Sequence, residues 1–156
     1  MPEGRATCGV ITVQPASRNV IPGAALLTAE FRHPDDASLE MMNRALRNVV
    51  SDTARDLGLE IRIEQIATYP AQVFDSGCLN AIRRAATTLD LSHHDIISGA
   101  GHDAVYMARV APAAMIFIPC VGGISHNEAE DCKPEWVRNG ANVLLHAMLE
   151  KAEVVR

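Results

Sequence analysis

The sequence predicts an α/β protein built in two parts. Residues 1–70 are predicted to form half of an α+β, ferredoxin-like unit with the order strand–strand–helix–strand. Residues 71–156 are predicted to form part of an α/β domain with mainly parallel strands, because helical patterns there alternate with short apolar ones. The periodicity changes across residues 69–74, which we therefore take as the boundary.

Two strands open the first part. Residues 7–13 are β-branched and partly alternating, which is typical of a strand. Residues 24–32 alternate between an apolar face and a more polar one, as the side chains of a half-buried strand do. Residues 14–23 hold two prolines and a glycine, and they predict a loop between the strands.

A long helix and a third strand follow. Asp36 suits the N-cap of a helix that runs to Leu57, and Gly58 suits the position just beyond its end. Residues 59–66 begin with a clean apolar–polar alternation, which predicts a half-buried strand. A complete split βαβ unit needs one more strand and helix, and we expect these to precede Met1.

The second part begins with a helix capped by Asp75 or Ser76 and ending near Leu89. The elements predicted after it are a short strand at 95–98, a helix at 102–110, a wholly apolar strand at 114–119 and a helix from Pro134 to about Lys151. An apolar run such as 114–119 is typical of a strand buried on both faces of a parallel sheet.

Composition excludes several classes of protein. The net charge of the 156 residues is −5 and no basic run exceeds the pair Arg83-Arg84, so a nucleic-acid partner is not expected. The longest uncharged stretch, residues 110–124, is too short to span a membrane, and the N-terminus has no apolar signal-peptide core. The four cysteines are widely spaced, which favours reduced thiols in a cytoplasmic protein.

Two loops that follow predicted strands carry candidate functional histidines. The glycine-rich loop at 98–104 contains His102 and could approach a ligand closely, although a simple tight turn explains it equally. The loop at 122–130 contains His126 and Glu130, which would share a face on a helical turn. The imidazole could bind a metal and the carboxylate could orient it, but a surface histidine in a polar loop remains the alternative.

Asn19 and Arg32 form a third candidate site. Asn19 lies in the loop before the second strand, and Arg32 ends that strand. An amide and a guanidinium could together hold a small carboxylate, with the arginine binding through two hydrogen bonds. The alternative is that Arg32 pairs with Glu30 or Asp35 on a solvated face.

Several motifs in a fixed order give the chain a family resemblance. They are S-R-N-V-I-P-G, E-F-R-H-P-D, S-G-A-G-H-D-A, F-I-P-C-V-G-G-I-S-H-N-E-A-E and D-C-K-P-E-W-V-R-N-G-A-N-V-L-L-H. This series is similar to the amidase and carbamoylase branch of the M20-type metallohydrolases, which includes N-carbamoyl-L-amino acid hydrolases, allantoate amidohydrolases and β-ureidopropionases. The resemblance covers residues 9–152.

The resemblance implies roles for the candidate residues. It implies that residues 1–70 are part of a lid that makes a homodimer, and that residues 71–156 end a catalytic domain holding a divalent metal such as zinc, manganese or cobalt. The lid asparagine and arginine of the family fall on Asn19 and Arg32, as contacts of the substrate. The last metal-binding histidine falls on His126, and His102 falls in a loop that lines the substrate pocket.

The resemblance also implies ligands that the sequence does not contain. The His-x-Asp metal ligands, the paired glutamates with the general base and the lid histidine would all precede Met1. We therefore expect a fragment that is inactive alone and that an N-terminal chain could complement. A non-catalytic module for dimerisation or for binding small carboxylates is the alternative, and a non-functional relic is a third hypothesis.

Overall fold

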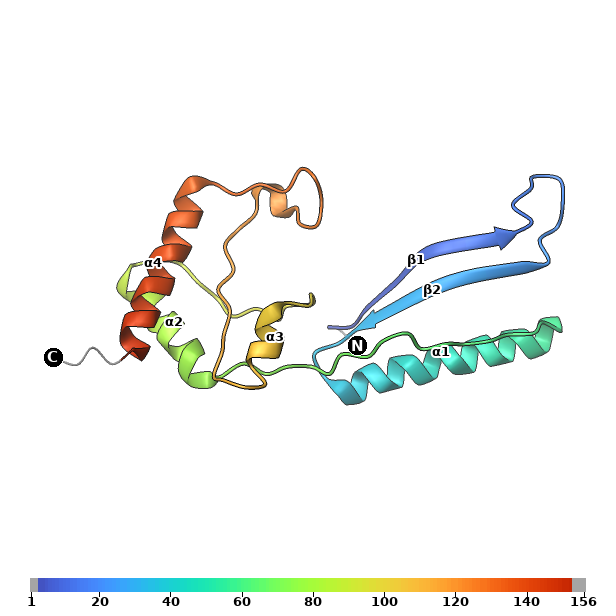
Figure 1. The fold of residues 1–156 in the computed structure, drawn as a ribbon, viewed down its shortest axis with the longest axis horizontal. Coiled ribbons are helices and arrows are strands. Elements are labelled where there is room, and N and C mark those ends of the chain that lie inside the picture. Colours follow the sequence, from blue (N-terminus) through green and yellow to red (C-terminus); the bar gives the residue numbers. More distant parts are fainter. Residues whose placement is uncertain (1–2, 153–156) are drawn as a thin grey trace. The chain divides into compact units, whose positions relative to one another are not determined.

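The computed structural model describes residues 3–152, and the chain forms two compact units that divide between Ala71 and Gln72 (Figure 1). This division lies one residue beyond the boundary placed from the sequence. No helix within residues 3–152 combines the length and the apolar character that a membrane crossing requires. The secondary structure of these described residues is mixed, with a two-stranded antiparallel sheet and four α-helices, which agrees with the α/β class at a coarse level.

A β-hairpin forms the frame of the first unit. Strands β1 (Arg5–Gln14) and β2 (Ala24–Arg32) pair antiparallel, with Arg5 opposite Arg32 and Gln14 opposite Ala24. The Gly23 N–H donates to the Gln14 carbonyl at 2.8 Å and closes the hairpin loop. The pairing places the hairpin loop at one end of β2 and Arg32 at the other, which decides how the candidate residues are separated.

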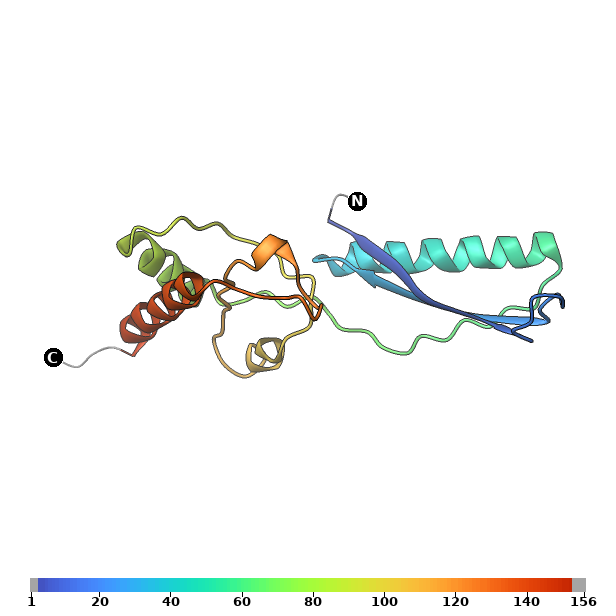
Figure 2. The ribbon, with the colours of Figure 1, turned by 90° about the horizontal axis from the view of Figure 1, so that it is seen from above.

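Helix α1 (Asp36–Leu57) runs beside the hairpin (Figure 2). Asp35, rather than the expected Asp36, is its N-cap, because the Asp35 carboxylate accepts the Ser38 N–H at 2.7 Å. Asp36 instead accepts the Ala71 N–H at 2.9 Å, which ties the end of the unit to the start of the helix. Gly58 ends the helix in the left-handed region, with φ of 65°.

Residues 59–66 form no strand, which corrects the sequence prediction. They lie extended, and Leu59 and Ile61 of the expected inner face are 55% and 47% exposed. A strand exists only where a neighbour supplies hydrogen bonds along its length, and the alternation of side chains does not reveal whether that neighbour is present. Within residues 3–152 this segment has no such neighbour. The order in the first unit is therefore strand–strand–helix.

The core of the second unit lies between two helices that pack through mostly small residues. Helices α2 (Ser76–Thr88) and α4 (Pro134–Lys151) contact each other. The buried residues of the described chain all lie on these two helices: Ala81, Ala85, Ala86, Val143 and Ala147. Small side chains allow the two helices to approach closely, and they explain why this pair packs although the other residues within 3–152 are half-buried or exposed.

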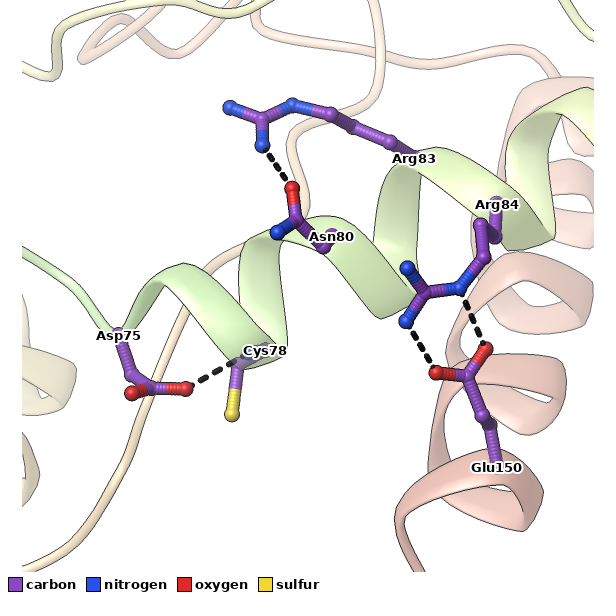
Figure 3. A network of polar contacts seen from close by, with 6 residues as sticks. All are labelled: Asp75, Cys78, Asn80, Arg83, Arg84 and Glu150. Carbon is purple, nitrogen blue, oxygen red and sulfur yellow. Dashed lines mark hydrogen bonds and ion pairs between the residues drawn. The ribbon is translucent and has the colours of Figure 1, made fainter.

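Polar contacts fix the ends of these helices (Figure 3). The Asp75 carboxylate caps α2 by accepting the Cys78 N–H at 2.7 Å. Arg84 on α2 makes a two-pronged ion pair with Glu150 on α4, with Nε donating to Oε2 at 3.1 Å. Pro134 occupies the first turn of α4, where its missing N–H costs nothing.

The strands predicted at 95–98 and 114–119 are also not formed in the structure, and the predicted helix at 102–110 shortens to α3 (Asp103–Met107). The reason is the same as for residues 59–66, because an apolar run indicates burial without supplying a hydrogen-bonding neighbour. The segment at 114–119 is nevertheless close to α4. A Cβ built on Gly140 would lie 2.6 Å from the Ile118 methyl group Cγ2, so a larger residue there would require Ile118 or the helix to shift.

Candidate functional site

The loop that carries His126 is held by the carboxylate of Glu130, which lies four residues further along the same loop. His126 has φ of 56°, a left-handed conformation that a non-glycine residue adopts only where its surroundings hold it. Its backbone N–H donates to Oε2 of Glu130 at 2.8 Å. The other oxygen, Oε1, accepts the Cys120 thiol hydrogen at 3.8 Å. Glu130 therefore fixes the loop, and His126 itself is exposed.

This geometry corrects one prediction about Glu130. The sequence placed His126 and Glu130 on one face of a helical turn, with the carboxylate orienting the imidazole. The structure has no helix there, since the short 3-10 turn η1 (Val121–Gly123) ends before His126. The carboxylate binds the backbone of His126 instead of its ring. A bend forms because Asn127 offers two local acceptors, its side-chain oxygen to Ala129 at 2.9 Å and its carbonyl to Glu130 at 2.9 Å.

His102 lies in a second loop and is oriented from two sides. Its Nε2 is 3.1 Å from Oγ of Ser98, and its ring meets the Phe117 ring edge-on at a centroid distance of 5.5 Å. The same Ser98 oxygen accepts the Ala100 N–H at 3.2 Å, which fixes the hydroxyl group. The half-buried imidazole is thus held between a hydroxyl group and an aromatic ring, although His102 does not cap α3 through its side chain. Sequence reasoning missed Ser98 and Phe117, whose signals were a hydroxyl four residues before His102 and an aromatic residue in the apolar run.

Arg32 pairs with Glu30, two residues earlier on the same face of β2. The hydrogen bond from Arg32 and its positive charge lower the pKa of the Glu30 carboxyl below its usual range. The hydrogen bond to Glu30 raises the pKa of the Arg32 guanidinium in turn. This pair is the alternative that the sequence left open, and a substrate carboxylate would have to compete with Glu30 for the arginine.

Asn19 and Arg32 are far apart within one chain. Asn19 lies in the hairpin loop, where its side-chain oxygen accepts the Ser17 hydroxyl at 2.6 Å. Arg32 is eight residues beyond Ala24, the first residue of β2, and a rise of about 3.3 Å per residue separates these two by about 26 Å. A small carboxylate cannot touch both residues of the same chain, so the structure does not bring this predicted pair together.

Metal donors are also dispersed. Among residues 3–152, no three side chains of the types His, Cys, Asp and Glu lie close enough to hold one ion. A hydrolytic metal site takes about three protein ligands or more. The described donors therefore do not fit a metal centre by themselves, and His126 is a single candidate ligand.

Comparison with known proteins identifies the class. The model of Peptidase family M20/M25/M40 matches residues 1–150, which include all four candidate residues, and the chain belongs to this family. The resemblance noted in the motifs is thereby confirmed.

The similar proteins narrow the class further. The N-carbamoyl-L-amino-acid amidohydrolase of Rhizobium meliloti is 44% identical over 147 residues, which are 94% of this chain and 35% of that protein. The ureidoglycolate hydrolase of Arabidopsis thaliana is 33% identical over 139 residues, 88% of this chain and 29% of that protein. The crystal structure of an amidase of the hydantoinase/carbamoylase family from Burkholderia multivorans is 56% identical, with a TM-score of 0.91 over 97% of this chain and 37% of that one. The chain thus spans about a third of its relatives' length.

Proposed function

We propose that this chain is part of a metal-dependent amidohydrolase that cleaves C–N bonds of linear amides, N-carbamoyl amino acids or allantoate-like ureido acids. The observation that carries the proposal is the 44% identity, over 94% of the chain, to a protein named N-carbamoyl-L-amino-acid amidohydrolase. The names of the other relatives agree in chemical class, since ureidoglycolate and allantoate are also ureido acids.

In this proposal His126 is one metal ligand. Its exposed ring and its backbone, fixed by Glu130, suit a ligand that must be presented in one orientation. The metal, such as zinc, manganese or cobalt, would polarise the carbonyl group and activate water. The remaining ligands and the general base would come from sequence that lies N-terminal to these residues in a longer protein, or from a complementing chain, because the described donors are dispersed.

Arg32 would bind the carboxylate of the substrate, Asn19 would donate or accept a hydrogen bond, and His102 would contact the polar group that is cleaved. The separation of about 26 Å along β2 supports a homodimer through the first unit. In a two-fold dimer, one substrate could meet Asn19 of one chain and Arg32 of the other, which a single chain does not allow.

Complementation tests the proposal. The chain is co-expressed with the remainder of the Rhizobium meliloti relative, and release of the free amino acid from an N-carbamoyl-L-amino acid is measured with zinc, manganese or cobalt. We expect a complex with metal-dependent turnover. His126→Ala should lower the rate about a hundredfold or more, while His94→Ala, an exposed histidine outside the site, should leave it unchanged. Absence of a complex, or of turnover with every metal, would contradict the proposal.

The same material distinguishes a non-catalytic carboxylate-binding module. Titration of an N-carbamoyl amino acid into the chain and into Arg32→Ala measures binding without chemistry. Binding that the substitution weakens about tenfold, together with no turnover in the complemented sample, would favour the binding module over the hydrolase.

A further inference from the structure

A cysteine lies at each end of the loop that carries His126. Cys120 immediately precedes Val121, and Cys132 immediately follows Asp131. The Val121 N–H donates to the Asp131 carbonyl at 2.7 Å, so the two ends of the loop lie side by side. Cys120 and Cys132 each lie one residue, about 3.8 Å between Cα atoms, from a partner in this bond, which brings the two cysteines near each other. A disulfide needs about 4.4–6.8 Å.

The electrostatics of Cys120 place both thiols in one cluster. Partial burial raises the pKa of the Cys120 thiol, and the Glu130 carboxylate and the Cys132 thiol raise it further. The effect of Cys132 agrees with the proximity that the bond between Val121 and Asp131 indicates. The other two cysteines, Cys8 and Cys78, do not act on this thiol and lie on β1 and α2.

We propose that Cys120 and Cys132 are a redox pair whose reversible disulfide closes the loop of residues 121–131. Hydrogen peroxide would oxidise one thiolate to a sulfenic acid, with hydroxide leaving. The second thiolate would then attack that sulfur, form the S–S bond and expel a second hydroxide. The two thiol protons combine with the two hydroxides, so two thiols and one peroxide give one disulfide and two waters. A small dithiol reverses the reaction.

The surroundings of Cys120 slow its reaction with peroxide, because its hydrogen is held by Glu130 and its ionisation is disfavoured. Closing the loop at its base would also restrict where the His126 ring can lie. That consequence for metal binding rests on the proposed function, whereas the disulfide itself does not.

Peptide mapping tests the disulfide directly. The full chain is treated with hydrogen peroxide under native conditions, and its mass, free thiols and cross-linked peptides are measured. We expect the free thiols to fall from four to two, a mass loss of two hydrogens and one internal link between Cys120 and Cys132. The double variant Cys8→Ser, Cys78→Ser should form the same link, and Cys132→Ser should not.

Equilibration in a glutathione redox buffer measures how far the fold, rather than the short sequence separation of the two cysteines, favours the disulfide. We expect the disulfide to be favoured about tenfold or more in the folded chain over the same chain in urea. An equal equilibrium in the two states, a link between other cysteines, or oxidation without a link would overturn the proposal. Neither metal binding nor turnover is measured, so a failure of the hydrolase proposal would leave this result unaffected.

Discussion

The carboxylate of Glu130 holds the loop that carries His126, the candidate metal ligand. It accepts the backbone N–H of His126 and the thiol hydrogen of Cys120 with different oxygens. Because the bond to His126 stabilises a left-handed conformation, the position of the imidazole depends on a residue that need not touch a metal. Sequence spacing alone suggested a carboxylate beside the ring, since periodicity cannot distinguish a ring contact from a backbone contact.

Removal of this carboxylate should release the loop. In Glu130→Ala we expect the amide of His126 to exchange its hydrogen about tenfold faster, because a charge-assisted hydrogen bond that protects it is lost. Hydrogen–deuterium exchange of the peptide that covers residues 121–131 measures this. Glu128→Ala removes the same charge two residues away and should leave the exchange unchanged. Equal exchange in the two variants would show that Glu130 does not hold the loop.

Helices and strands differ in how well the sequence predicts them. The bounds of α4 agree with the prediction and those of α1 and α2 nearly so, because caps such as Asp75 and Gly58 act within a few residues of where they stand. Strands β1 and β2 were predictable because they are neighbours in the sequence and pair with each other. The segments at 59–66, 95–98 and 114–119 were not, since pairing depends on a neighbour that the local pattern does not specify.

The close contact between α4 and residues 114–119 makes a prediction at the scale of the element. Gly140→Ala should destabilise the second unit by about 1–3 kcal/mol, because the new methyl group would lie 2.6 Å from Cγ2 of Ile118. That methyl group belongs to a β-branched side chain with little freedom to move away. The effect opposes the usual gain of about 1 kcal/mol when alanine replaces glycine in a helix.

Chemical denaturation monitored by helical circular dichroism measures the Gly140→Ala effect. Arg138→Ala, an exposed change on the same helix between residues of similar helix propensity, is the matched control and should alter stability little. A Gly140→Ala variant more stable than the parent would mean that Ile118 does not pack against α4.

The whole described chain buries little of its apolar surface. Its buried residues are four alanines and one valine, whereas large side chains such as Ile21 and Ile66 are 92% and 89% exposed. A stable domain of this size normally buries large aliphatic side chains. Exposed apolar surface of this kind is typical of regions that contact other protein.

Self-association is the outcome expected for the chain without a partner. Light scattering after size exclusion should show dimers or larger species, and a dye that binds apolar surface should fluoresce strongly, because the exposed residues gain from mutual burial. Leu26→Thr on β2 reduces this surface and keeps a residue suited to a strand, so it should lower both signals, whereas Arg62→Lys should change neither. Co-expression with the remainder of the Rhizobium meliloti relative should suppress dye binding more than either variant. A monomer that binds no dye would contradict this prediction. It would also remove the physical reason to expect a complementing chain.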